Sequence, residues 1–315
     1  MPRFFVVGGY LPAGGALMSY RVAEIAARRF GWDAHVVQMD GETPRHGVYR
    51  YPAEFPTVTV DGMLAEATAG DALLMNPSFS PLGLGLRFPG RTLMYAQGFS
   101  TFSLLDAHFD RYVSVGSFVQ RFLHGVYGIE SRVIAAFIDD PPAVPAAWHE
   151  RPDKLVLYHA KGIAAPLVAT LVERALAELS AALPGWRFEP LVAAGEGMVP
   201  QAEVGRRLEG TRYLLTLSPA EGFGLIPLEA MARGVVVAGF DGFGGVDYMV
   251  PGGNCRTVPY GSVPRMVAAA IEAFSDPTLA AALSRAARAT AAAYRFEAFE
   301  TRWVAELRSF LGAGA

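Results

Sequence analysis

The sequence predicts an α/β protein made of two doubly wound, Rossmann-like domains, each built on a parallel sheet. Two observations lead to this prediction. Short apolar runs bounded by Gly, Pro or Asp alternate with longer helical patterns along the chain, which is typical of βαβ units. The chain also has 315 residues, which is twice the usual domain size of ~150 residues.

The first half alternates candidate strands with helical segments. Strands are predicted at Phe4–Val7, His35–Met39, Ala72–Met75, Thr92–Tyr95, Tyr112–Val115 and Arg132–Ala135. The helix predicted over Gly15–Phe30 places Met18, Val22 and Ile25 on one face at the i, i+4, i+7 spacing. This pattern predicts one doubly wound domain over residues 1–143.

The segment 139–149, DDPPAVPAAWH, is predicted to link the domains. Its prolines remove backbone donors and fix φ, so neither a helix nor a central strand can run through it. The strand pattern then restarts over residues 144–296, with strands at Lys154–Tyr158, Arg187–Leu191, Tyr213–Leu217, Val235–Ala238 and Cys255–Val258. A last segment, 297–315, contains a helix whose stripe of Phe299, Trp303 and Leu307 predicts docking across the domains.

Composition excludes several classes of protein. With 52% hydrophobic and 18% charged residues the chain can bury a large core, and its net charge of −3 provides no pull toward nucleic acid. The single cysteine, Cys255, rules out an intramolecular disulfide and argues for a reducing compartment. The apolar run in MPRFFVVGGY is too short for a signal-peptide core or a membrane span. We therefore expect a cytoplasmic protein.

The segment SPAEGFGLIPLEAMARG, residues 218–234, contains the residues best suited to a ligand site. It leaves a buried strand and enters a helix near Ile226, so Glu221 to Gly224 form a loop at the carboxyl edge of the sheet, where open α/β sheets bind ligands. Gly222 and Gly224 permit close backbone approach and leave amides free at a helix N-terminus, which suits a diphosphate. Carboxylates at Glu221 and Glu229 can accept hydrogen bonds from the hydroxyls of two sugars.

The plain alternative is that Glu221 is a solvated loop residue and Glu229 a helix-surface charge. Against it, SPAEGFGLIPLEAMARGVVVAGFDGFGGVDYMV resembles the E-x7-E donor site of family-4-like retaining glycosyltransferases of the GT-B fold. The resemblance implies that Glu221 contacts the donor hexose, that the backbone of Gly222, Phe223, Gly224 and Leu225 contacts sugar and phosphate, and that Glu229 binds the ribose hydroxyls. It also implies retention of anomeric configuration, no metal ion and no cofactor besides the nucleotide-sugar substrate.

The family usually has an Arg and a Lys after the first strand of the second domain, and both neutralise the donor diphosphate. In KLVLYHAKGIAAPLV only Lys161 is present. The resemblance assigns Lys161 the leaving-group charge, and Arg91, Arg121 or another distant residue would have to replace the missing arginine.

Looser similarity covers three more segments. GGYLPAGGALMSYR resembles the family's first strand, glycine-rich loop and helix, where Gly14 and Gly15 would approach the diphosphate and acceptor. In LMYAQGFSTF, Gln97 and Gly98 are candidates for the acceptor side, and in LVAAGEGM the resemblance places Gly195 beside the nucleotide base. The family's usual histidine near the donor sugar has no assignable counterpart, because His108 and His124 are expected on helices.

The sequence therefore predicts a metal-independent, retaining glycosyltransferase that uses a UDP- or GDP-sugar and a saccharide, lipid-linked or small-molecule acceptor. A lipid-linked acceptor would bring the protein to a membrane surface, although no basic amphipathic helix indicates this. The alternatives are a catalytically silent sugar-nucleotide-binding scaffold, and an epimerase or phosphorylase-like enzyme on the same fold. A dinucleotide oxidoreductase is disfavoured because VVGGYLPAGGA lacks the G-x-G-x-x-G spacing.

Overall fold

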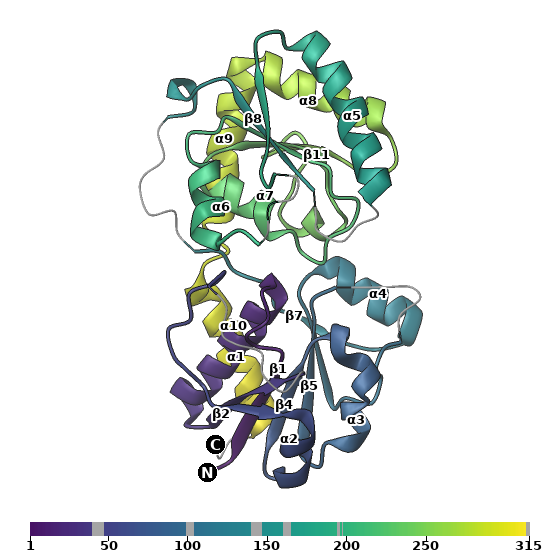
Figure 1. Cartoon of the computed structure of the whole chain (residues 1–315), viewed down its shortest axis with the longest axis vertical. Coiled ribbons are helices and arrows are strands. Elements are labelled where there is room, and N and C mark those ends of the chain that lie inside the picture. Colours follow the sequence, from purple (N-terminus) through teal and green to yellow (C-terminus); the bar gives the residue numbers. More distant parts are fainter. Residues whose placement is uncertain are drawn as a thin grey trace. The chain divides into compact units, whose positions relative to one another are not determined.

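The computed structural model describes residues 1–39, 47–98, 104–139, 147–159, 165–193, 196 and 198–312 (Figure 1). By their internal contacts the residues form two units. The first comprises Met1–Phe137 and Phe296–Ala315, and the second comprises Ile138–Arg295. The predicted boundary at 143/144 lies six residues further along the chain than the observed one, and that at 296/297 lies one residue further. The last helix groups with the first unit.

The first unit is built on one parallel sheet with the strand order β3-β2-β1-β4-β5-β6-β7. The strands are β1 (Arg3–Val7), β2 (Asp33–Gln38), β3 (Thr57–Thr59), β4 (Ala72–Met75), β5 (Arg91–Ala96), β6 (Arg111–Ser114) and β7 (Arg132–Val133). Each strand except β3 was predicted. β3 is a three-residue edge strand with exposed ends, so it lacks the apolar run that marks a buried strand.

Helices flank this sheet: α1 (Gly14–Phe30), α2 (Val60–Glu66), the 3-10 helix η1 (Pro77–Leu82), α3 (Leu84–Arg87) and α4 (Ser117–Tyr127). In α1 the predicted stripe of Met18, Val22 and Ile25 is fully buried. The helix ends at Gly31, which has a φ of 70° and donates its amide to the last turn. The predicted helix was therefore correct to within one residue at its start.

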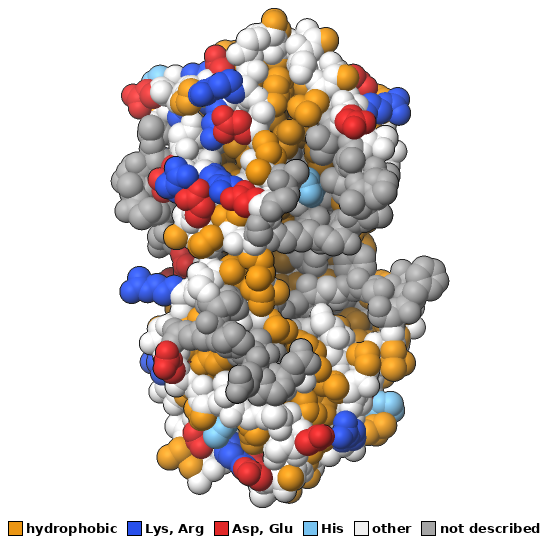
Figure 2. All heavy atoms as spheres, in the orientation of Figure 1, with side chains coloured by type: hydrophobic (Ala, Val, Ile, Leu, Met, Phe, Trp, Pro, Cys, Tyr) orange, Lys and Arg blue, Asp and Glu red, His pale blue; other side chains and the backbone are white. Residues whose placement is uncertain are grey.

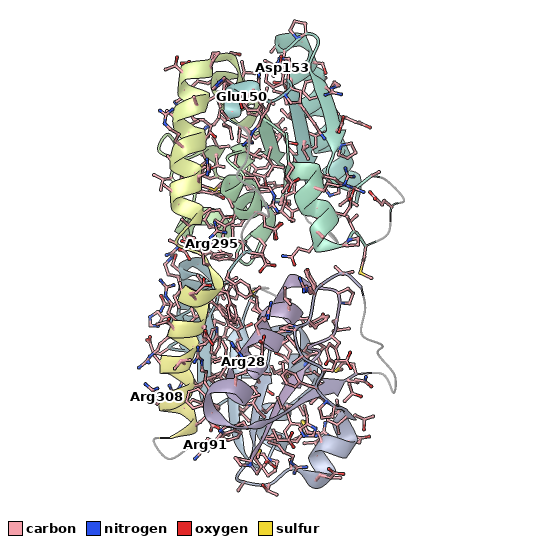
Figure 3. All side chains as sticks on the ribbon, turned by 90° about the vertical axis from the view of Figure 1, so that its left-hand side faces the viewer. Arg28, Arg91, Glu150, Asp153, Arg295 and Arg308 are labelled. Atoms are coloured by element: carbon pink, nitrogen blue, oxygen red, sulfur yellow. The ribbon has the colours of Figure 1, made fainter. Side chains whose placement is uncertain are left out.

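The C-terminal helix α10 (Phe296–Leu311) lies along α1 in the first unit (Figure 3). The Trp303 ring packs edge-on against Tyr95 of β5, with 5.0 Å between ring centroids. On the outer side the Glu300 carboxylate pairs with Arg28 at 2.8 Å and with Arg29 at 2.9 Å. The predicted apolar stripe of this helix is thus core packing within the first unit.

The second unit has a parallel sheet with the order β12-β11-β10-β8-β9. Its strands are β8 (Lys154–Tyr158), β9 (Arg187–Pro190), β10 (Tyr213–Thr216), β11 (Val236–Phe240) and β12 (Arg256–Val258). Its helices are η2 (Trp148–Glu150), α5 (Ala165–Ala182), α6 (Gln201–Leu208), α7 (Leu225–Ala232), η3 (Gly244–Asp247), α8 (Val263–Ser275) and α9 (Pro277–Ala291). All of its strands were predicted, with boundaries that differ by at most two residues.

Strand order decides where each sheet can bind a ligand. In a doubly wound sheet the crevice opens at the carboxyl edge, between neighbouring strands whose connections leave in opposite directions. In the first unit these strands are β1 and β4, and in the second unit they are β8 and β10. The loops that follow these four strands are therefore the places to look for a site.

No single helix in the described ranges is long and apolar enough to cross a membrane; Val263–Ser275 and Pro277–Leu311 pass that test only as a pair bent by 99°.

Candidate functional site

The loop between β10 and α7 lies where the sequence predicted it, and α7 begins one residue before the predicted start near Ile226. The backbone leaves β10 after Thr216, and α7 begins at Leu225. Gly224 caps the helix with a φ of 86°, in the left-handed region that favours glycine. The Gly224 carbonyl accepts a hydrogen bond from the Tyr248 hydroxyl. A Cβ on Gly224 would lie 2.9 Å from the Tyr248 hydroxyl oxygen. The loop thus presents the α7 N-terminus at the carboxyl edge of the sheet.

Glu221 is held in this loop from both its backbone and its side chain. Its Oε1 accepts a hydrogen bond from the Tyr158 hydroxyl at 2.8 Å, and its backbone amide donates to the Gly242 carbonyl at 2.7 Å. Burial raises the pKa of the Glu221 carboxyl, while hydrogen bonds from Tyr158 and Ser218 act in the opposite direction. A carboxylate has about four lone-pair sites, so with these two donors it keeps acceptor capacity for a ligand hydroxyl.

The loop after the neighbouring strand β11 supports the Glu221 loop. Glu221 and Phe243 form an isolated parallel bridge. A Cβ on Gly244 would lie 2.5 Å from the Glu221 carbonyl oxygen and 2.6 Å from the Phe223 amide nitrogen, so the two backbones touch. Phe243 itself has a φ of 61°, which is rare for a residue other than glycine. The Glu221 loop is therefore braced by a second, sterically constrained loop.

Glu229 lies on α7 and is buried, with 6% of its surface exposed. The Gln201 amide at the start of α6 donates to its Oε1 at 3.3 Å. Burial is the largest cause that raises the pKa of Glu229 to about 7; the nearby Arg233 charge and the Gln201 hydrogen bond oppose it, and Asp139 adds to it. A buried carboxyl with one long hydrogen bond and a pKa near neutrality is typical of a functional position. Glu229 is not the helix-surface charge of the plain alternative.

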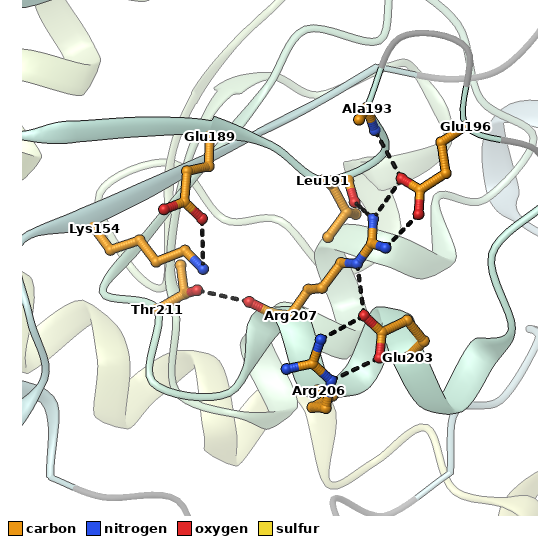
Figure 4. A network of polar contacts seen from close by, with 9 residues as sticks. All are labelled: Lys154, Glu189, Leu191, Ala193, Glu196, Glu203, Arg206, Arg207 and Thr211. Atoms are coloured by element: carbon orange, nitrogen blue, oxygen red, sulfur yellow. Dashed lines mark hydrogen bonds and ion pairs between the residues drawn. The ribbon is translucent and has the colours of Figure 1, made fainter.

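Charged side chains also organise the segment that follows β9 (Figure 4). Arg207 of α6 pairs with the carboxylates of Glu196 and Glu203 and donates to the Leu191 carbonyl at 2.8 Å. Oε2 of Glu196 in turn accepts a hydrogen bond from the Ala193 amide at 2.9 Å. Figure 2 shows basic and acidic side chains side by side at the surface of the second unit, over the part where α6 lies in Figure 1. The network ties the end of β9 to α6, which also carries Gln201.

The first unit holds a separate cavity of about 480 Å³. It lies at the carboxyl ends of β1, β4 and β5, and its lining includes Gly15, Gln97 and Gly98. The Gln97 amide donates to the Ser19 hydroxyl at 3.1 Å, and a Cβ on Gly15 would lie 2.1 Å from Gln97 Oε1. Gly15 is therefore required for the close approach of Gln97 to α1. The structure brings these three predicted residues together, whereas Gly14 begins α1 outside the lining.

Two predicted residues, Lys161 and Gly195, lie outside the described residues. Two further candidates lie within the described residues. Arg91 begins β5 and therefore lies at the edge of the first sheet opposite the carboxyl ends of its strands, away from the loops that follow those ends. Arg121 is exposed on α4, where its guanidinium donates to Ser117 at 3.1 Å.

The histidine expectations were half correct. His124 lies on α4 as predicted, but His108 lies in irregular backbone, where its Nδ1 is 3.3 Å from the Asp106 carboxylate. In the part of the chain that the structure describes, no group of three or more His, Cys, Asp or Glu side chains could hold a metal ion.

Sequence reasoning missed the residues that position the two glutamates. Tyr158 ends β8, Gln201 begins α6 and Gly242–Gly244 follow β11. The only local signal was the cluster DGFGG directly after a predicted strand. Tyr158 and Gln201 carry no motif, because their roles depend on which strands and helices are neighbours.

Solved structures with the same fold cover most or all of this chain. Sucrose-phosphate synthase from Thermosynechococcus elongatus has a TM-score of 0.71 at 15% identity and covers 100% of both chains. The Anabaena protein HepE, in complex with UDP, has a TM-score of 0.69 at 12% identity and covers 98% of this chain and 100% of its own. The pneumococcal O-GlcNAc transferase GtfA, in complex with UDP and GlcNAc, has a TM-score of 0.60 at 15% identity and covers 78% of this chain and 58% of its own.

These similarities establish the fold, which is the two-domain GT-B architecture. No curated protein matches the sequence. The segment from residue 197 to residue 290, which contains Gln201, Glu221 and Glu229, matches the family model described as glycosyl transferases group 1.

Proposed function

We propose that this protein is a glycosyltransferase that moves a sugar from a nucleotide-sugar donor to a hydroxyl acceptor. The observation that carries the proposal is the loop–helix segment from Glu221 to Glu229, which follows β10 at the switch point of the second sheet and lies inside the family match. The named neighbours in complex with UDP support a nucleotide diphosphate as part of the donor.

In this proposal the donor binds along the β10–α7 segment. The unpaired amides at the α7 N-terminus and the positive end of the helix dipole favour the diphosphate. The Glu229 carboxylate accepts hydrogen bonds from the ribose hydroxyls, and the Glu221 carboxylate accepts one from a hydroxyl of the donor sugar. Both carboxylates bind hydroxyls, so the two-carboxylate mechanism of glycoside hydrolysis does not apply.

The proposed reaction is a substitution at the anomeric carbon with retention of configuration. The acceptor oxygen forms a bond to C1, the bond from C1 to the diphosphate oxygen breaks, and the departing diphosphate takes up the hydroxyl proton. Lys161 and the α7 amides would offset the charge that develops on the leaving group, without a metal ion. The first unit would bind the acceptor, which is a saccharide, a lipid-linked sugar or a small molecule. If the acceptor is lipid-linked, we propose that the protein is a cytoplasmic enzyme that works at the membrane surface.

Calorimetric titration with UDP, GDP, ADP and dTDP, each without added metal, tests the donor site. We expect one nucleotide to bind selectively. Glu229→Ala should weaken that binding, because the ribose hydroxyls lose the carboxylate to which they donate hydrogen bonds. Glu221→Ala should chiefly lower turnover. Glu209→Ala, which removes an exposed glutamate at the end of α6, is the matched control and should behave as the wild type.

This titration, together with turnover assays and product analysis, separates the alternative functions. Absence of binding to all four nucleotides, or binding that neither glutamate variant alters, would contradict the donor site. Donor binding without turnover over a panel of acceptors would favour the silent scaffold. Release of an epimerised nucleotide sugar or of a sugar phosphate, identified by product analysis, would favour the other enzymes on this fold.

A further inference from the structure

The cavity of the first unit differs in chemistry from the loop that holds Glu221. Its lining consists largely of apolar side chains from four parts of the unit: Leu11, Phe79, Leu104, Leu105, Phe122 and Leu123. Polar groups enter from Asn76, Ser78, Gln97 and Tyr127. None of the lining residues within the described ranges is Asp, Glu, Lys, Arg or His. The described lining thus offers neutral hydrogen-bonding groups and apolar surface, with no cation among its residues.

This lining discriminates by charge. An acceptor that carries a phosphate or a carboxylate would lose hydration in the cavity without gaining a cationic partner, which is costly. A neutral hydroxyl compound loses little, and its apolar body gains from burial against leucine and phenylalanine. The volume of about 480 Å³ lies in the usual range for small-molecule sites.

The polar groups are held in place within this apolar surface. The Asn76 side-chain oxygen accepts a hydrogen bond from the Ser78 backbone amide at 3.0 Å, and the Gln97 side-chain amide donates one to the Ser19 hydroxyl. Fixed amide groups can orient a hydroxyl without attracting a charge. At the rim, Leu104 is 72% exposed, and Figure 2 shows other hydrophobic side chains at the surface of the first unit where α3 and α4 lie in Figure 1.

We propose that this cavity binds the acceptor and selects an uncharged, largely apolar hydroxyl compound over a phosphorylated or carboxylated sugar. The identification of the bound compound as the acceptor rests on the proposed function. The binding preference itself belongs to the first unit and can be measured without a nucleotide.

The test uses a matched pair of probes with the full chain: 2-naphthol, which is neutral, and 6-hydroxynaphthalene-2-sulfonate, which adds one negative charge to the same rings. Binding is followed by naphthol fluorescence and by calorimetry at pH 7. We expect 2-naphthol to bind about tenfold more tightly or better, because none of the described lining residues offers a cation to the sulfonate. Equal affinity, or tighter binding of the sulfonate, would overturn the proposal.

Two exposed leucines provide a matched pair of variants. Leu104 lines the cavity, whereas Leu86 on α3 is 71% exposed and does not line it. Leu104→Lys should weaken 2-naphthol binding and strengthen sulfonate binding by about threefold, since an ion pair exposed to solvent is weak. Leu86→Lys should leave both affinities unchanged. If the two variants act alike, the probes bind elsewhere and the proposal is wrong.

The UDP titration on the same samples separates the two hypotheses. Selective 2-naphthol binding in a protein that binds no nucleotide would contradict the proposed function and leave the cavity preference standing. Nucleotide binding that depends on Glu229, together with no preference for 2-naphthol, would overturn the cavity preference alone.

Discussion

The Tyr158 hydroxyl donates a hydrogen bond to Oε1 of Glu221 at 2.8 Å, and this contact joins the end of β8 to the loop that follows β10. Burial and the neighbouring carboxylate raise the pKa of Tyr158 well above its usual value, so the phenol keeps its proton and acts as the donor. The bond fixes one oxygen of Glu221 and favours its ionised form. Tyr158 is therefore a positioning residue for Glu221.

Tyr158→Phe should lower kcat about tenfold and change the Kd for the nucleotide less than twofold, because the missing bond orients Glu221 and not the nucleotide. Loss of the hydrogen bond also raises the pKa of Glu221, since that bond lowers it. The acid limb of the kcat profile should therefore move to higher pH. Steady-state kinetics from pH 5 to pH 9 provide the measurement.

Tyr213→Phe is the control for that substitution. Tyr213 is also buried on a central strand of the second sheet, and its hydroxyl donates to the Phe274 carbonyl at 3.3 Å, away from Glu221. This variant should lose some stability and keep the wild-type pH profile. A pH profile that shifts equally in both variants would mean that Tyr158 acts only as a core residue.

Glu229 should make the free protein less stable as pH rises. Its folded pKa of about 7 lies above the ordinary glutamate value of 4.5, so folding favours the protonated form. Below pH 4.5 both states are protonated and the group has no effect; between pH 4.5 and pH 7 only the unfolded state ionises, and stability falls. The full cost above pH 7 is up to about 3 kcal/mol, at 1.36 kcal/mol for each pKa unit.

Glu229→Gln removes this titration and keeps the shape of the side chain. We expect the Tm of the variant, relative to the wild type, to rise between pH 4.5 and pH 8, while its affinity for the nucleotide falls. In the wild type that affinity should decline as pH drops below about 7, because a protonated carboxyl accepts fewer hydrogen bonds. A Tm difference that is the same at both ends of this range would contradict the raised pKa.

Gly244→Ala should displace the Glu221 loop. The new Cβ would lie 2.5 Å from the Glu221 carbonyl oxygen, and backbone atoms cannot move aside as a flexible side chain can. We expect a loss of about 1–3 kcal/mol in unfolding free energy and a marked fall in turnover. Gly125→Ala on α4, where a Cβ meets nothing within 4 Å, should be stabilising and should leave turnover unchanged. Full activity in Gly244→Ala would show that the loop tolerates the shift.

Arg207→Gln should release the segment after β9. Arg207 binds both Glu196 and Glu203, whereas Arg206 binds Glu203 alone among the described residues. Because Glu196 accepts the Ala193 amide, loss of Arg207 should speed hydrogen exchange at Ala193. Arg206→Gln is the matched control and should leave that amide protected. Similar exchange rates in the two variants would mean that Glu196 holds Ala193 without Arg207.

Local patterns predicted much of this fold. Periodicity found α1 and the strands of both sheets except β3, because buried strands and amphipathic helices each have an apolar period that is visible within a few residues. The loop from Glu221 to Gly224 was also predicted, because the apolar strand pattern ends at Ser218–Pro219 and a helical pattern follows near Ile226.

The partners of these residues came only from the tertiary structure. Tyr158 and Glu221 are 63 positions apart and meet because β8 and β10 are neighbours in the sheet, a strand order that no local pattern contains. Packing also decided that Glu229 is buried, that α10 belongs to the first unit and that neutral side chains enclose the cavity. The sequence by itself determined the elements and the chemical groups. Long-range packing determined which groups meet, how deeply each is buried and hence the pKa and the ligand each can have.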